Sequence, residues 1–163
     1  MIENLFSLLS NLQLLWFLVG SLVTAVAFLF FFFKRERRLF KNIKRPVGII
    51  PSKEDSMNQE TELLRRVGFF NIYPPLDSLR GIDLIDNRYR LVILRYQKGS
   101  ESFWKTFDSL VMKTIPVVVF AKPGEIDRTD VEKIQGYSLH TLCNTPLRLI
   151  SDVFAIMSTY PEK

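Results

Sequence analysis

The chain has 163 residues, of which 47% are hydrophobic, and its formal net charge is +5. That length accommodates one modest domain with an appendage. A single cysteine, Cys143, excludes an internal disulfide framework and a zinc cluster built from cysteines. A single histidine, His140, argues against a metal site or a Ser-His-Asp triad within one chain, so we expect neither a metal nor a cofactor.

The excess positive charge lies in one short segment. Residues Lys34–Arg45 include seven basic side chains and one acidic one, whereas residues 46–163 contain fifteen of each. Because proteins that bind double-stranded nucleic acid usually present a broad basic surface, we do not expect such a partner. The basic segment instead predicts contact with anionic lipid beside a membrane helix, with a nucleic-acid role of this segment alone as the alternative.

An apolar run precedes the basic segment. Residues Leu14 to Phe33 carry no charge, and as a helix they would extend about 30 Å, the thickness of a bilayer's hydrocarbon core. The run is longer than the apolar part of a typical signal peptide, no basic residues precede it, and no small-x-small cleavage pattern follows. We therefore predict an uncleaved transmembrane helix at about residues 12–33.

The charges on the two sides of this helix predict its orientation. Only Glu3 precedes it, and seven basic residues follow. Since basic residues favour the cytoplasmic side, we predict a single-pass membrane protein with its N-terminus outside and its C-terminal domain in the cytoplasm. Residues 1–33 would form the membrane segment, 34–45 a basic juxtamembrane segment, and 46–163 a cytoplasmic domain. One helix cannot form a pore, so action on the membrane would require a homo-oligomer.

Residues 46–163 alternate between short apolar runs and amphipathic stretches. In chain order they predict a strand at Val47–Ile50, a helix at Glu60–Val67, a strand at Phe69–Tyr73, a short helix or ordered loop at Leu76–Ile85, a strand at Tyr89–Tyr96, a helix at Glu101–Thr114, a strand at Pro116–Ala121, a short helix at Asp130–Ile134, a strand at Tyr137–Cys143 and a helix at Thr145–Thr159. Continuously apolar strands separated by helices are typical of a parallel sheet covered on both faces. The predicted fold is a small, doubly wound, mostly parallel α/β domain.

Side-chain periodicity also predicts which residues face the core. The expected inward residues are Leu63, Leu64 and Val67 in the first of these helices, and Leu147, Ile150, Val153, Phe154 and Met157 in the last. We expect Trp104 and Phe107 to belong to the core as well. Cys143 is expected to be a small buried hydrophobe and His140 a strand residue in an ordinary hydrogen bond.

Doubly wound folds bind ligands beyond the carboxyl ends of their strands. The loops at that position carry basic side chains, and two of them stand before helices, whose free N–H groups favour anions. We therefore expect a phosphate-bearing ligand there, bound by some of Ser52, Lys53, Arg95, Tyr96, Lys98, Ser100, Lys122, Asn144, Thr145 and Arg148. A simpler interpretation stays open for each group. Ser100 and Thr145 would then serve only as helix N-caps, Gly99 and Gly124 only as turn residues, and the basic side chains would simply be solvated. No phosphate-loop motif occurs.

Three segments resemble the TIR family of signalling domains, which have a flavodoxin-like architecture. The segment Ser102–Asp108 resembles that family's Ser-x-Trp-Cys-x-x-Glu helix start, Asp77–Gly81 is similar to its Asp-x-x-Pro-Gly loop, and Ile115–Phe120 resembles the strand that follows. In enzymatic members the glutamate carries NAD glycohydrolysis, so the resemblance implies Asp108 as the catalytic carboxylate and Trp104 near the substrate. Two departures weaken the match: Lys105 replaces the cysteine and Arg80 replaces the loop proline.

The layout as a whole resembles small membrane-anchored effectors of bacterial antiviral nucleotide signalling, including type III CRISPR and cyclic-oligonucleotide systems. That resemblance implies a sensor-effector that binds a cyclic oligonucleotide and acts on the inner membrane through oligomerisation. Two other functions stay open. One is a TIR-like NAD hydrolase, and the other is a non-enzymatic, membrane-bound adaptor for protein interactions. We expect the chain to lack enzymatic activity, and the NAD hydrolase is the enzymatic alternative.

Overall fold

A computed structural model describes residues 2–73 and 89–159 of the chain. It divides into two compact units, Met1–Phe40 and Lys41–Lys163. The predicted helix or loop at Leu76–Ile85 and the TIR-like segment Asp77–Gly81 lie outside the described residues.

The first unit is a single helix. Helix α1, Ile2–Ile43, contains a stretch, Leu12–Ile43, that is long and apolar enough to cross a membrane, with a mean hydropathy of 2.4 and an exposed surface throughout its most apolar window. The helix continues through most of the basic segment predicted at 34–45. Its last residues already belong to the second unit, because Asn42 and Ile43 are each 3% exposed and Ile43 lies in that unit's core.

The second unit is built on a five-stranded sheet. Its strands are β1 (Pro46–Ile50), β2 (Asn71–Ile72), β3 (Leu91–Arg95), β4 (Val117–Phe120) and β5 (His140–Cys143), in the spatial order β2-β1-β3-β4-β5. Every pair is parallel, with Val47 beside Leu91 in the central register. The predicted doubly wound parallel α/β fold is confirmed, and the five predicted strands are found, with β2 shorter than expected.

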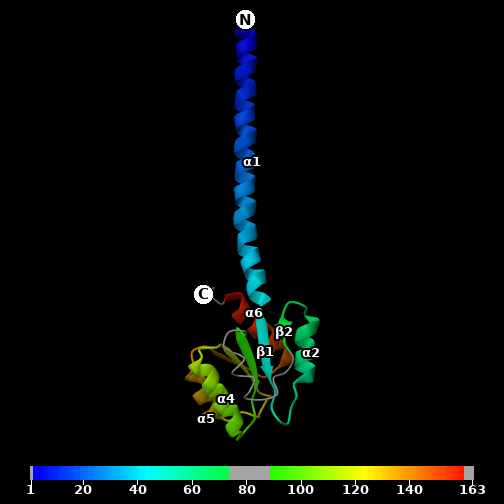
Figure 1. Cartoon of the computed structure of the whole chain (residues 1–163), viewed down its shortest axis with the longest axis vertical. Coiled ribbons are helices and arrows are strands. Elements are labelled where there is room, and N and C mark those ends of the chain that lie inside the picture. Colours follow the sequence, from blue (N-terminus) through cyan, green and yellow to red (C-terminus); the bar gives the residue numbers. More distant parts are fainter. Residues whose placement is uncertain (1, 74–88, 160–163) are drawn as a thin grey trace. The chain divides into compact units, whose positions relative to one another are not determined.

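Helices cover both faces of the sheet (Figure 1). They are α2 (Asn58–Arg66), α4 (Glu101–Met112), α5 (Arg128–Gln135) and α6 (Pro146–Thr159). One core joins α2 and α6 to the sheet through Leu64, Leu149 and Val153. The other joins α4 and α5 to the opposite face through Phe107 and Ile134. This two-sided burial explains why the strands are continuously apolar rather than alternating.

Local signals fix where the helices begin. The Ser100 hydroxyl accepts a hydrogen bond from Phe103 N at 3.3 Å, and Thr145 Oγ1 accepts one from Arg148 N at 3.3 Å, so both residues cap helices as the sequence suggests. Pro146 occupies the first position of α6, where a missing N–H costs little. Gly99, before α4, has a φ of +68°, a conformation that favours glycine.

Some predicted core positions were wrong. Leu63 is 36% exposed, Leu147 is 78% exposed and Phe154 is 41% exposed. Helix α6 instead buries a narrow stripe of Leu149, Val153 and Met157, which recurs every four residues, so Leu147 and Phe154 fall outside it. In α2 the buried positions are Glu60, Thr61 and Leu64. Cys143 is buried, as expected, and the His140 ring bonds the Tyr137 carbonyl.

Candidate functional site

The four loops that follow β1, β3, β4 and β5 lie at one end of the parallel sheet, and we call them the strand-end face. They comprise residues 51–57, 96–100, 121–127 and 144–145. Eight of the ten predicted ligand-binding residues lie in these loops, Arg95 is the last residue of β3, and Arg148 lies in the first turn of α6. Ligands of doubly wound folds bind at this end of the sheet.

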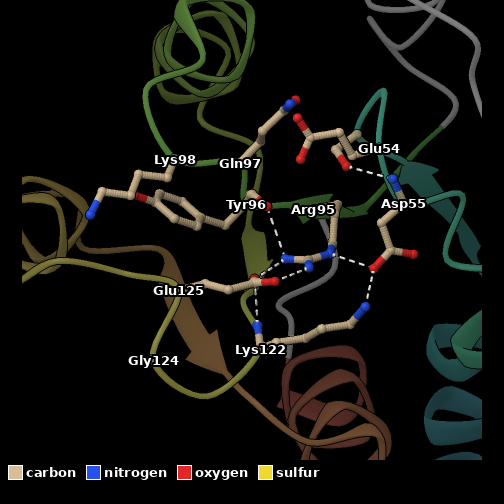
Figure 2. A pocket seen from close by; sticks show the side chains of 10 residues that line it. Glu54, Asp55, Arg95, Tyr96, Gln97, Lys98, Lys122, Gly124 and Glu125 are labelled. Atoms are coloured by element: carbon tan, nitrogen blue, oxygen red, sulfur yellow. Dashed lines mark hydrogen bonds and ion pairs between the residues drawn. The ribbon is translucent and has the colours of Figure 1, made fainter.

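Arg95, the last residue of the central strand β3, organises this face (Figure 2). Its side chain is only 4% exposed, and its guanidinium group donates to both oxygens of Glu125, at 2.6 and 2.7 Å. It also donates from Nε to Asp55 Oδ2 at 3.1 Å. Further bonds reach the carbonyl oxygens of Tyr96, at 2.8 Å, and Phe120, at 3.2 Å. Such a forked pair is strong and directional, so Arg95 holds the loops after β1 and β4 to the end of β3.

Lys122 adds a second cation to the same cluster. Its Nζ lies 2.7 Å from Asp55 Oδ2, and its backbone N–H donates to Glu125 Oε2 at 2.8 Å. The hydrogen bond from Lys122 is the main reason that the pKa of Asp55 falls to about 2, with Met57 N–H and Arg95 lowering it further against the effect of burial. The pKa of Glu125 is also lowered, chiefly by Arg95. Both carboxylates are therefore charged at neutral pH.

The loop after β1 is shaped to present Asp55. Ser52 Oγ accepts from Asp55 N at 3.0 Å, and Asp55 Oδ1 accepts from Met57 N at 3.1 Å. Met57 itself is fully buried in a left-handed conformation with a φ of +52°. The other partner loop turns at Gly124, whose φ is +82°. These local bonds aim both carboxylates at Arg95.

The pH dependence of stability should report on this cluster. A carboxyl group whose pKa is lowered by folding stabilises the folded state above its unfolded pKa, and that contribution is lost as the pH falls through the folded pKa. For Asp55 the loss should run from about pH 5 to about pH 2 and amount to roughly 2 kcal/mol. Urea unfolding of the detergent-solubilised chain at a series of pH values would measure it. Asp55→Asn should flatten the profile, whereas Glu54→Gln, an exposed neighbour, should not; equal profiles in all three proteins would contradict this assignment.

A pocket of about 420 Å³ opens over the cluster. Its lining residues are Ser52, Glu54, Asp55, Arg95, Tyr96, Gln97, Lys98, Lys122, Gly124 and Glu125. Five of the predicted residues line it: Ser52, Arg95, Tyr96, Lys98 and Lys122. The lining contains three basic and three acidic side chains, so the pocket is close to neutral. Glu54, Asp55 and Glu125 were not predicted, because only the basic side chains of these loops suggest contacts to an anion, although Glu125 follows Gly124 directly.

Two further predicted residues of this pocket also have acidic partners. Tyr96 is 2% exposed, and its hydroxyl donates to Asp130 Oδ2 at 2.5 Å. Burial first, and then this bond, raise the pKa of Tyr96, which therefore stays neutral. Lys98 Nζ lies 2.8 Å from Asp127 in an exposed ion pair. The Tyr96–Asp130 hydrogen bond ties the loop after β3 to α5, and the Lys98–Asp127 ion pair ties the same loop to the loop that precedes α5.

A second pocket, of about 380 Å³, lies beside β5 and has a different charge. Its lining residues are Ala121, Lys122, Pro123, Gly124, Ile126, Gln135, His140, Leu142, Asn144 and Arg148. The lining holds two cations, Lys122 and Arg148, and no carboxylate. Arg148 Nε lies 3.6 Å from Asp152 and its side chain is 59% exposed. Lys122 lines both pockets, so the two form adjoining parts of one face.

The remaining predicted residues lie apart from the two linings. Lys53 and Ser100 lie on the strand-end face without lining either pocket, and Thr145 caps α6. The TIR-like pair also lies outside both pockets. Trp104 is half-buried and packs against Phe103, and Lys133 Nζ lies over its ring, 4.5 Å from the ring centre. Asp108 is exposed on α4. Among the described residues, no group of three or more His, Cys, Asp or Glu side chains is placed to hold a metal ion.

Comparison with known proteins supports the fold alone. No family model matches the sequence, and no curated protein matches it. Solved structures do match, among them the receiver domain of the Francisella response regulator 1452. That domain is 13% identical, with a TM-score of 0.54, and the match covers 71% of this chain and 97% of that domain. The chain is thus an apolar N-terminal helix followed by a receiver-like, flavodoxin-like α/β domain.

Proposed function

We propose that this protein is a single-pass sensor-effector of the bacterial inner membrane, with its N-terminus outside and its α/β domain in the cytoplasm. The domain would bind an anionic nucleotide signal of the cyclic oligonucleotide class at the strand-end face. Binding would change the packing of a homo-oligomer, and the anchors would then act on the membrane. The resemblance of the layout to antiviral effectors is the basis for proposing a role in antiviral defence.

The observation that carries the proposal is the acid-free lining of the second pocket. Arg148 supplies positive charge, because its ion pair with Asp152 is long, at 3.6 Å, and its side chain is 59% exposed, whereas Lys122 is already paired with Asp55. Asn144 and Gln135 supply amide donors for phosphate or base atoms. The positive end of the α6 dipole lies beside Asn144 and also favours an anion. A volume of about 380 Å³ lies at the small end of ligand sites, so a cyclic oligonucleotide would be shared between subunits.

The test is isothermal titration of the full chain in nanodiscs against a panel of cyclic oligonucleotides. We expect one member to bind, and Arg148→Ala to weaken binding by about tenfold or more, as expected for loss of a charge-assisted contact. Arg128→Ala is the matched control, because Arg128 also pairs with an acid one helical turn away but lies outside the pocket. Absence of heat with every member, or equal losses in the two variants, would refute the proposal.

A second function is favoured by the first pocket. Each of its three cations already has an acidic partner, so that part of the face offers little net charge to a ligand. Ion pairs within the strand-end loops would instead hold these loops rigidly together, which suits an adaptor that presents them to a partner protein. An adaptor would retain its function in Arg148→Ala, so the same variant distinguishes the two functions.

A further inference from the structure

The end of the sheet opposite to the strand-end face has a different charge. We call the loops that precede the strands, with the last turn of α2, the strand-start face; the described loops are 44–45, 67–70, 89–90, 113–116 and 136–139. Within these described residues the charged side chains are all basic: Lys44, Arg45, Arg65, Arg66, Arg90 and Lys113. The last turn of α5, at the same end of the sheet, adds Glu132 and Lys133, so basic side chains predominate among the described residues of this end. The strand-end loops, by contrast, hold Glu54, Asp55, Glu125 and Asp127 against three lysines. Among the described residues, the loops of the strand-start face are therefore more basic than the loops of the strand-end face.

Exposed apolar side chains interrupt this basic face. Phe69, before β2, is 53% exposed; Met112, before β4, is 84% exposed; and Leu139, before β5, is 41% exposed. Phe69 and Leu139 lie in the loops that lead into β2 and β5, and Met112 is the last residue of α4, before the loop that leads into β4. Because β2 and β5 are the two edges of the sheet, four strand spacings apart, these side chains are distributed over about 19 Å. An extended basic surface with scattered apolar tips suits the headgroup region of a bilayer, which attracts both kinds of side chain.

Chain connectivity keeps this face within reach of a membrane. The chain enters the domain here, because Ile43 ends α1 in the domain core and β1 begins at Pro46. The apolar run ends at Phe33, so the helical residues between it and the domain extend only about 15 Å. A tether of that length holds the domain at a high effective concentration at the bilayer surface, where weak contacts suffice.

We propose that the strand-start face docks on the anionic headgroups of the bilayer. Arg65 and Arg66 make the electrostatic contacts, and Phe69 and Met112 insert into the interface. Arg66 also pairs with Glu62 at 3.3 Å, and both side chains are exposed. Such an exposed pair contributes little, so its rearrangement toward a lipid phosphate has a small cost. Docking through this end points the strand-end face away from the lipid; it rests on the proposed membrane anchor and cytoplasmic orientation but not on nucleotide binding.

The test compares the full chain in nanodiscs of zwitterionic phosphatidylcholine with nanodiscs that also contain anionic phosphatidylglycerol. Amide hydrogen exchange is measured for peptides that cover 67–70 and 111–116. We expect the anionic lipid to slow exchange there several-fold, with no change at 122–127 on the opposite face. Removing one basic contact near a charged surface should reduce this protection by about fivefold.

Matched variants make the test specific. Arg65→Glu and Phe69→Ser should each remove most of the protection, whereas Lys53→Glu, an exposed charge reversal on the opposite face, should retain it. Unchanged protection of the β3 amides in the same data shows that each variant is folded. Equal exchange in the two lipids, or equal losses in Arg65→Glu and Lys53→Glu, would overturn the proposal.

Discussion

Replacing Arg95 with methionine is expected to lower the free energy of unfolding of the α/β domain by about 3–5 kcal/mol. The change removes the guanidinium group that donates two of the hydrogen bonds of Glu125 and one of those of Asp55, while Glu125 keeps its bond from the Lys122 N–H. Two carboxylates would then face each other across the end of β3 with only Lys122 between them. Leaving a charge without its partner in a partly buried site is far more costly than losing an exposed ion pair.

Urea unfolding of the detergent-solubilised chain measures this effect, with Trp104 as the fluorescent probe in a Trp16→Phe background. Lys98→Met is the matched control, because Lys98 and Asp127 are 65% and 51% exposed and such pairs contribute at most about 1 kcal/mol. Arg95→Lys should fall between the two variants, since lysine keeps the charge but lacks the forked geometry. Adding Asp55→Asn and Glu125→Gln to Arg95→Met should recover part of the loss. A loss in Arg95→Met no larger than in Lys98→Met would contradict the assigned role.

Leu149→Ala is expected to destabilise the domain by about 2–5 kcal/mol, and Leu147→Ala by less than about 0.5 kcal/mol. The two leucines lie two positions apart in α6, so helix propensity changes almost equally in the two variants. Leu149 is fully buried against the sheet, whereas Leu147 is 78% exposed. Only the first substitution therefore leaves a cavity.

The same unfolding measurement compares the two variants directly. Val153→Ala, one turn further along the buried stripe, should behave like Leu149→Ala with a smaller loss, because it removes two side-chain carbons rather than three. Similar losses at 147 and 149 would mean that α6 contacts the sheet through the broader face that the sequence suggests, and would contradict the observed packing.

The α/β fold was predictable because its strands are apolar on both faces. Val117–Phe120 and Leu91–Leu94 have no polar residue to suggest a solvent-facing side, and helices with clear caps separate them. The width of each helix's buried face was less predictable. Periodicity alone included Leu147 and Phe154, because it does not reveal how much of α6 the sheet can cover.

The candidate site was predicted in position but not in charge balance. The rule that ligands bind at strand ends identified Arg95, Lys98 and Lys122, which share one pocket. It gave no means of pairing them with Asp55 and Glu125, which lie forty residues before and thirty after Arg95 in sequence. A basic residue that ends a buried strand is itself a signal, since a charge there requires acidic partners from neighbouring loops.

The wholly parallel sheet also has a consequence for how the domain forms during synthesis. Val47 of β1 pairs with Leu91 of β3, and among the described strands the edge strand β2 pairs with β1. No two neighbouring strands are joined by a short hairpin, so each pairing must first close a long loop, which slows folding. The apolar N-terminal helix leaves the ribosome well before Leu91–Arg95. In the proposed single-pass arrangement, membrane insertion would therefore precede the first central strand pairing, and the domain would complete its sheet while already tethered.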